Sequence, residues 1–85
     1  MILLEHRNFE KSFKKLPPKI RKAFYARIVL FQSNQYDPIL NNHSLQGKYA
    51  GKRSINITGD YRAIFIQGGD VVTLFDIGTH PELYE

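Results

Sequence analysis

Hydrophobic residues near the start of the chain predict a strand followed by a helix. Residues 2–5 form a short apolar run suited to a strand. The next apolar residues fall on one stripe of a helix, at Phe9, Phe13 and Leu16. Asn8 is the expected N-cap of this helix, because its side chain can accept a hydrogen bond from an unpaired backbone N–H. Pro17 and Pro18 end the helix, since a proline ring removes a backbone donor and restricts the residue before it.

A second helix is expected over residues 18–33, with Pro18 as its first residue. Its apolar face consists of Ile20, Ala23, Phe24, Ile28 and Phe31. The two helices are expected to form an antiparallel hairpin with its basic side outward. Residues 34–42 are rich in turn formers and contain a proline, which predicts a loop over the edge of a sheet.

In the second half of the chain the apolar spacing changes to every second residue, which is typical of strands. Residues 53–57, 61–67 and 71–77 are expected to form a three-stranded meander, joined by glycine-containing turns. The complete order is βααβββ. This order predicts an α+β fold, in which a helical hairpin packs on a mainly antiparallel sheet.

Length and composition limit the classes of protein to consider. The chain has 85 residues, which predicts a single domain over residues 1–85. It has no cysteine, so disulfides and a thiolate nucleophile are excluded. No apolar run approaches the roughly 18 to 20 residues that a membrane span requires. Glu5, His6 and Arg7 follow the first apolar run, where a signal peptide would continue its core. We therefore expect a cytoplasmic protein without a membrane partner.

Positive charge is concentrated in two parts of the chain. Residues 1–27 carry eight Lys or Arg against two acidic residues, and residues 48–62 carry four against a single Asp. Residues 63–85 carry four acidic residues and no Lys or Arg. Two basic regions of this kind are typical of contact with the phosphate backbone of a nucleic acid, although ordinary solvated helix faces give the same pattern.

Two of the three histidines stand where a catalytic side chain is expected. Histidine is the side chain best suited to proton transfer near neutral pH. His43 lies just before the expected meander and His80 just after it, at strand margins where a sheet presents loop residues to a substrate. His6, at the end of the first strand, is expected to be structural.

Cleaving RNA without a metal requires a base for the ribose 2′-hydroxyl, an acid for the departing 5′-oxygen and cations for the charge on the phosphorane. His43 or Asp60 is the candidate base, although Asp60 also suits a turn, and His80 is the candidate acid. The candidate cations are Arg53, Lys52 and Arg62. Arg53 shares one side of its strand with two isoleucines on the nominally buried face. As the first residue of the strand it either emerges at the sheet edge or packs its stem while its guanidinium reaches solvent.

Further RNA contacts are expected from Tyr61 and Tyr84, which are candidates to stack on splayed bases, and from Lys48. Tyrosines in so small a domain also serve as core residues. The histidines are scattered and the acids isolated, so no spacing suits a metal site. Neither a phosphate-binding glycine loop nor a nucleophile elbow is present. No cofactor is therefore expected.

Several short motifs follow one another in an order that resembles the YafQ-like branch of the RelE/ParE toxin superfamily. They are His43-x-Leu45-x-Gly47, Gly51-x-Arg53, the stretch GDYRAIF at 59–65, and Gly78-Thr79-His80-x-x-Leu83-Tyr84. They lie within residues 43–84, about half the chain, and the start of the chain agrees with the same pattern. The resemblance implies a RelE-like fold with a helical hairpin on one face of the sheet and an RNA-binding concavity on the other.

The resemblance also implies a ribosome-dependent, metal-independent endoribonuclease, which cuts mRNA and leaves a 2′,3′-cyclic phosphate and a 5′-hydroxyl. The acid–base positions of the pattern match His43, Asp60 and His80, its strand arginine matches Arg53, and its aromatic positions match Tyr61 and Tyr84. The chain departs from the pattern at Ser54 and Asn56, where the family usually has Asp and then His. Neither residue transfers a proton at neutral pH.

Toxins of this superfamily are partnered by an antitoxin with an acidic, partly disordered arm. The resemblance therefore implies a toxin–antitoxin hetero-oligomer, and the basic helices are candidates to contact ribosomal RNA. Two alternatives stay open. One is a ParE-like toxin that binds DNA gyrase and has no nuclease activity. The other, motivated by Ser54 and Asn56, is a catalytically silent binding module that keeps the fold.

Overall fold

The structure, a computed structural model, describes residues 1–84 and confirms the expected α+β fold. In chain order its elements are β1 (Ile2–Glu5), α1 (Arg7–Lys14), α2 (Pro18–Ser33), the 3-10 helix η1 (Pro38–Leu40), β2 (His43–Ser44), the 3-10 helix η2 (Gly47–Tyr49), β3 (Arg53–Asn56), β4 (Tyr61–Gly68), β5 (Val71–Thr79) and α3 (His80–Tyr84). The expected βααβββ order is present within this series. No helix in residues 1–84 is long and apolar enough to cross a membrane.

The strands form one sheet in the order β1-β5-β4-β3-β2. The meander β3–β4–β5 is antiparallel, and β1 lies parallel to β5 at the edge of the sheet. A parallel neighbour requires a long crossover, which α1, α2 and the meander supply. The pairing of β4 with β5 shifts register between Ile64 and Phe65, because Ile64 faces Asp76 and Phe65 faces Leu74. Phe75 is thus the extra residue of a β-bulge.

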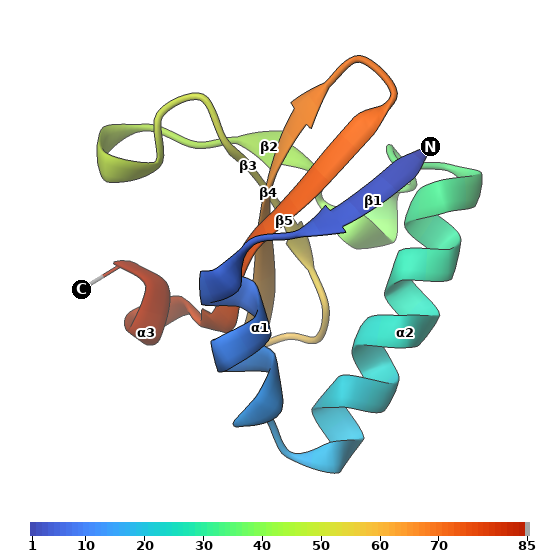
Figure 1. The fold of residues 1–85 in the computed structure, drawn as a ribbon. Helices are drawn as coiled ribbons and strands as arrows, with labels where there is room; N and C mark the ends of the chain where they lie inside the picture. The colour runs from blue at the N-terminus through green and yellow to red at the C-terminus, as the bar shows by residue number, and fades with distance from the viewer. Residues whose placement is uncertain (85) are drawn as a thin grey trace.

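The face of the sheet under α1 and α2 holds the main core (Figure 1). Phe9 of α1 and Phe24 of α2 place their ring centroids 5.4 Å apart. Deeper in the core, Phe31 meets Phe65 of β4 edge-on at 5.1 Å, and Phe65 has no exposed surface. We call this side the helix face.

The opposite side, which we call the open face, carries no long helix. Its strand residues include Ser54, Asn56, Arg62, Ile64, Ile66 and Phe75. The short helix α3 and the segment at 45–52 lie on this side of the sheet (Figure 1). Tyr49, Ile64 and Leu83 form a small second cluster here, and the Tyr49 hydroxyl donates a hydrogen bond of 2.8 Å to the Leu83 carbonyl. The open face is therefore only partly covered.

Four details of the sequence interpretation were wrong. His6 rather than Asn8 is the N-cap of α1, and its Nδ1 accepts a hydrogen bond of 3.0 Å from the Asn8 N–H. The segment expected as a loop at 34–42 contains η1, which buries Leu40 completely. The last strand continues to Thr79, two residues beyond its expected end. The elements β2 and α3 were not expected.

Candidate active site

A capping box at the end of β5 fixes the position of His80. Thr79 and Glu82 have the Thr-x-x-Glu spacing in which each side chain bonds the other residue's backbone N–H. Glu82 Oε1 accepts hydrogen bonds from the Thr79 N–H at 2.7 Å and from the Thr79 hydroxyl at 2.8 Å. These two bonds hold the pKa of Glu82 below its usual value. The capping box starts α3 at once after the strand, so His80 is exposed at the first position of the helix.

His80 and Asp60 line one hollow at the end of the sheet. The hollow has a volume of about 410 Å³ and is lined by Gly59, Asp60, Tyr61, Thr79, His80 and Pro81. The His80 N–H donates a hydrogen bond of 3.3 Å to the Asp60 carbonyl, which joins the turn before β4 to the start of α3. Asp60 and His80 are both exposed, so both side chains are open to a ligand. Three of the sequence-predicted residues, Asp60, Tyr61 and His80, therefore meet here.

Tyr84 extends this site along the open face. Its ring centroid lies 4.6 Å from that of His80, one turn earlier on α3. On its other side Tyr84 meets Tyr49 edge-on at 5.6 Å. Burial, followed by the negative charge of Asp76 and the neighbouring Tyr84, raises the pKa of Tyr49. Tyr49 is therefore a neutral side chain that supports α3. It was missed in the sequence because a lone tyrosine in the segment between two expected elements gives no signal.

Arg62 lies against the turn that carries Asp60. Its Nη1 donates hydrogen bonds to the carbonyls of Gly59 at 2.9 Å, Thr58 at 3.1 Å and Tyr61 at 3.2 Å. Gly59 and Tyr61 line the hollow, so the guanidinium is beside it. Within residues 1–84, the hydrogen bonds of the Arg62 side chain use Nη1, so Nε and Nη2 are available to an anion.

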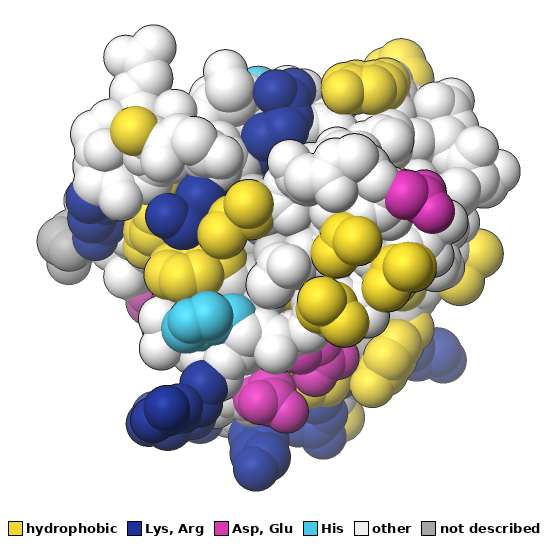
Figure 2. All heavy atoms as spheres, turned by 45° about the horizontal axis from the view of Figure 1, so that its top comes forward, with side chains coloured by type: hydrophobic (Ala, Val, Ile, Leu, Met, Phe, Trp, Pro, Cys, Tyr) yellow, Lys and Arg dark blue, Asp and Glu magenta, His cyan; other side chains and the backbone are white. Residues whose placement is uncertain are grey.

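Two lysines of the open face sit over aromatic rings. The Nζ of Lys52 lies 4.8 Å from the centroid of Phe75, and that of Lys48 lies 5.1 Å from the centroid of Tyr49. Figure 2 shows a face of the molecule on which dark blue and cyan side chains adjoin yellow ones in this way. Both lysines were predicted as RNA contacts, and both are near the Tyr49 cluster.

His43 lies on the open face but not in the hollow. It lies on β2, at the far edge of the sheet, where it pairs with Ser54 of β3. Its Nδ1 lies 2.8 Å from the Asn41 carbonyl. Three strand spacings and four residues along the strands separate it from His80, which corresponds to about 20 Å on a flat sheet. The structure therefore does not bring the two predicted catalytic histidines together.

Arg53 points to the other side of the sheet. It pairs with Phe65, whose side chain belongs to the helix face. The Arg53 Nε donates a hydrogen bond of 2.8 Å to Asn42 Oδ1, and the guanidinium carbon lies 6.0 Å from the centroid of Tyr36. Arg53 does not lie at the edge of the sheet, because β2 pairs with β3 and Ser44 faces Arg53. Its guanidinium reaches Asn42 and Tyr36 on the helix face, away from Asp60 and His80.

Ser54 and the half-buried Asn56 each place a buried, unpaired oxygen on the open face. Ser54 has no exposed surface, and neither its hydroxyl nor Asn56 Oδ1 has a partner within residues 1–84. Ser54 stands between His43 and Ile64, and Asn56 stands opposite Arg62. Unpaired buried polar atoms are uncommon and point to a bound water or a functional role. No group of three or more potential metal ligands occurs in the described part of the chain.

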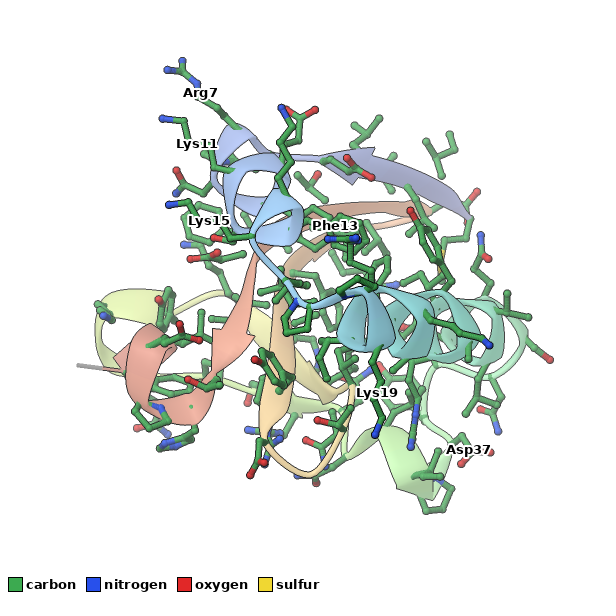
Figure 3. The ribbon with its side chains drawn as sticks, turned by 90° about the horizontal axis from the view of Figure 1, so that it is seen from below. Arg7, Lys11, Phe13, Lys15, Lys19 and Asp37 are labelled. Carbon is green, nitrogen blue, oxygen red and sulfur yellow. The ribbon has the colours of Figure 1, made fainter. Side chains whose placement is uncertain are left out.

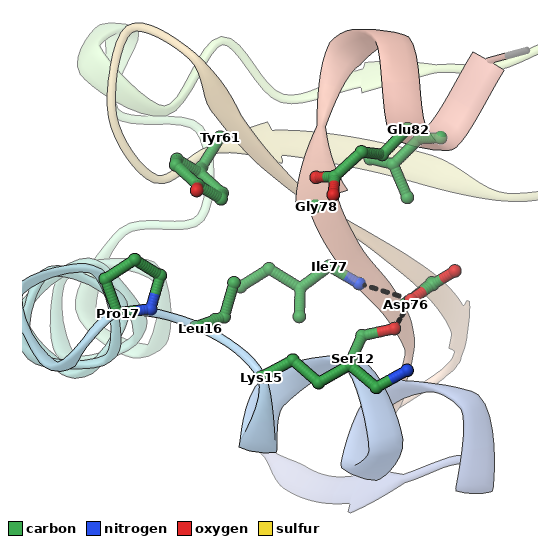
Figure 4. A pocket seen from close by; sticks show the side chains of 10 residues that line it. Ser12, Lys15, Leu16, Pro17, Tyr61, Asp76, Ile77, Gly78 and Glu82 are labelled. Carbon is green, nitrogen blue, oxygen red and sulfur yellow. Dashed lines mark hydrogen bonds between the residues drawn. The ribbon is translucent and has the colours of Figure 1, made fainter.

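A second hollow, of about 240 Å³, separates α1 from α3. The Ser12 hydroxyl donates a hydrogen bond of 2.6 Å to Asp76 Oδ1, which also accepts the Ile77 N–H at 2.8 Å (Figure 4). Tyr61 lines this hollow as well as the one at His80. The Ser12–Asp76 bond therefore ties α1 to the strand that leads into the candidate active site.

Comparison with known protein families decides which superfamily branch the chain represents. Residues 3–85 match the model described as a bacterial toxin of type II toxin–antitoxin systems, YafQ. The chain belongs to the YafQ toxin family. This confirms the resemblance found in the sequence. No match was found among curated protein sequences.

Solved structures of YafQ, RelE and YoeB/ParE toxins share the fold. YafQ from E. coli strain BL21(DE3) is similar with a TM-score of 0.84 at 17% identity, over 98% of this chain and 97% of that one. The Methanococcus jannaschii RelB-RelE antitoxin-toxin complex contains a chain with a TM-score of 0.76 at 24% identity, over 96% and 95% of the two chains. The YoeB/ParE toxin from Agrobacterium tumefaciens has a TM-score of 0.75 at 15% identity, over 94% and 99%. At these identities the similarity shows the fold alone.

Proposed function

We propose that this YafQ-family toxin is a metal-independent endoribonuclease that cuts mRNA on the ribosome and so inhibits translation. The observation that carries the proposal is the hollow in which Asp60 and His80 face solvent beside the Arg62 guanidinium. Such a hollow offers an acid, a base and a cation to one phosphodiester, which is what cleavage by the 2′-hydroxyl requires.

In this proposal Asp60 takes the proton from the 2′-hydroxyl and His80 donates one to the departing 5′-oxygen. The shared hollow favours Asp60 over His43 as the base, because His43 lies about 20 Å from His80. The free Nε and Nη2 of Arg62 bind the non-bridging phosphate oxygens, a task that suits the planar guanidinium. Arg53, on the helix face, is left without a step in the reaction.

The remaining predicted contacts bind RNA around this centre. Tyr84, whose ring is tilted against that of His80, and Tyr61, at the rim of the hollow, are candidates to contact bases next to the scissile bond. Lys48 and Lys52 lie further along the open face for the phosphate backbone. Basic residues on α1 and α2 are the candidates for ribosomal RNA contact.

We also propose an antitoxin as the protein partner, in a hetero-oligomer in the cytoplasm. The solved relatives include an E. coli DinJ-YafQ complex and a RelB-RelE antitoxin-toxin complex. The excess of positive charge on this chain favours an acidic partner segment.

The test is induction of the chain in bacterial cells, with mRNA ends mapped genome-wide. We expect translation to stop and new mRNA ends to appear in translated regions, and we expect neither with His80→Gln. DNA damage signalling with intact mRNA would replace the proposal by the gyrase-binding alternative. Harmless expression of the folded chain would replace it by the silent binding module.

A further inference from the structure

We propose that Phe75 and His6 form a nucleobase-binding subsite on the open face, with Lys52 at the adjoining phosphate. The inference rests on the proposed RNA-cleaving function and adds to it a second place where a base is held. Sequence reasoning assigned His6 a structural role and Phe75 no role.

The β-bulge in β5 places Phe75 on the open face. The register shift leaves Phe75 without a pairing partner on β4, between Leu74 and Asp76. Bulges re-aim side chains and are common beside active sites. Phe75 is half-buried against the Tyr49 cluster, whereas Phe65 on the helix face has no exposed surface. An aromatic ring that stays partly open to solvent is therefore built into this strand.

The exposed ring is bordered by a cation and by a second ring. Lys52 Nζ lies 4.8 Å from the Phe75 centroid, and the His6 centroid lies 4.8 Å away with its ring tilted by 45°. Tyr49 meets Phe75 from the protein side at 6.4 Å. Two rings that keep solvent-exposed surface next to an ammonium group match the needs of single-stranded RNA, in which bases stack on aromatic side chains and phosphates pair with cations.

Cations continue beyond His6 along α1. Arg7 directly follows His6, and Lys11 lies one turn later on the same side of α1, with Lys15 another turn on (Figure 3). The subsite is therefore placed between Lys52 and a basic helix edge, so phosphates on both sides of a bound base meet positive charge. Positive charge alone suits both RNA and an acidic protein segment. The exposed rings beside it favour RNA, because bases stack on aromatic rings and acidic side chains do not.

A bound base contacts Phe75 and His6 while Lys52 exchanges its contact with the ring for one with a phosphate. His6 has a second task, because its Nδ1 caps α1. Asparagine is also a strong N-cap residue, so His6→Asn keeps the cap and removes the ring. Phe75→Leu keeps an apolar side chain and removes the π face. These two variants separate base stacking from folding.

The experiment measures binding of a short single-stranded RNA at low salt by fluorescence anisotropy, alongside mRNA cleavage on ribosomes. Each base in turn is replaced by an abasic nucleotide. We expect Phe75→Leu to weaken binding by roughly 5- to 150-fold, the range found for the loss of one base stack. We expect the affinity of the wild-type chain for RNA to fall by a similar factor when the base at one position is removed. The affinity of Phe75→Leu should not fall further when the same base is removed. His6→Asn is expected to give a smaller loss at the same position.

The matched control is Tyr25→Leu, which removes an aromatic ring that is 58% exposed on α2, away from the open face. It should bind RNA as the wild-type chain does. Two results would overturn the subsite: folded Phe75→Leu binds RNA as tightly as the wild-type chain, or it loses the same factor on intact RNA and on RNA with the abasic position. Cleavage of mRNA by the wild-type chain would still support the proposed function in either case. If Phe75→Leu does not fold, the same comparison of intact and abasic RNA is made with His6→Asn. A loss of affinity that is equal on both RNAs, or no loss at all, would then overturn the subsite. Absence of both RNA binding and cleavage by the wild-type chain would overturn both proposals.

Discussion

The two faces of the sheet differ in what their side chains do. On the helix face, residues such as Phe31 and Phe65 are completely buried and apolar, and their rings are in contact. On the open face, lysines and histidines border half-exposed rings, and Ser54 and Asn56 leave buried polar atoms unpaired. The helix face is built for stability, and the open face keeps polar groups that a purely structural surface would pair or replace.

The difference has a physical origin in the small size of the chain. A domain of 85 residues without disulfides has room for one main core, so it concentrates its aromatic packing under α1 and α2. The open face then depends on the small Tyr49 cluster and on the capping box that docks α3. Substitutions on the two faces should therefore have separable effects on stability and on activity.

The largest expected effect is on the helix face. Phe65→Ala removes a fully buried ring that packs against Phe31, and we expect it to cost about 3 to 5 kcal/mol of unfolding free energy. Urea unfolding followed by circular dichroism measures the loss. The control is Val29→Ala on the outer side of α2, where the side chain is 65% exposed and the change should stay within about 0.5 kcal/mol. Equal losses of unfolding free energy in the two variants would contradict the assignment of Phe65 to the main core.

Asp60→Asn tests the open face without touching the fold. Within residues 1–84 the hydrogen bonds of Asp60 use only its backbone, so asparagine retains them. We expect mRNA cleavage to fall by about 10²- to 10⁴-fold, the usual contribution of a general base, and the unfolding midpoint to stay unchanged. His43→Gln is the matched comparison and should cut at nearly the wild-type rate. The reverse result would make His43 the base and Asp60 a turn residue.

Disturbing the capping box is expected to lower the stability slightly and to lower cleavage as well. Thr79→Ala removes the hydroxyl that Glu82 bonds and should cost about 1 kcal/mol. Because α3 carries His80, we also expect a partial loss of cleavage. Thr79→Ser restores the hydroxyl and should recover both properties. A loss of cleavage that serine does not recover would separate the capping box from the position of His80.

The same capping box predicts a pH dependence. The pKa of Glu82 is lowered in the folded chain, so its contribution to stability is complete above the pKa of the unfolded chain, about 4.3. It is lost as the pH falls through the lower pKa of the folded state. The difference in unfolding free energy between the wild-type chain and Glu82→Gln should therefore shrink on acidification. A difference that stays constant across this range would show that Glu82 contributes nothing through its charge.

The smallest effect is expected at Ser54. Its hydroxyl is buried without a partner in residues 1–84, so Ser54→Ala loses no hydrogen bond and removes a desolvated polar group. We expect the unfolding free energy to stay the same or to rise by up to about 1 kcal/mol. Differential scanning calorimetry measures this change. A clear loss of stability would mean that a bound water satisfies the hydroxyl.

The regular elements could be predicted from the sequence because spacing alone determines them. The Pro17-Pro18 break and the period-two meander located α2, β3, β4 and β5 to within two residues. What could not be predicted depends on contacts between distant residues. In the sequence Leu40 is part of a polar segment. It is completely buried in the main core only because the fold brings this segment against α2 and β3.

The candidate site was predicted in part for the same reason. Asp60 and His80 come together because β4 and β5 are adjacent, which a meander requires. The distance of His43 depends on its position at the outer edge of the sheet, and the strand order was not available from the sequence. The Thr79-x-x-Glu82 capping box was present in the sequence, and it was the signal that would have located α3.

The most direct measurement is cleavage of a defined mRNA on purified ribosomes by the wild-type chain and by His80→Gln, with the unfolding midpoint of both. We expect the wild-type chain to leave 2′,3′-cyclic phosphate and 5′-hydroxyl ends. His80→Gln should cut at least about 100-fold more slowly at unchanged stability. Equal cutting by the two chains would contradict the assignment of the hollow at Asp60 and His80 as the catalytic centre.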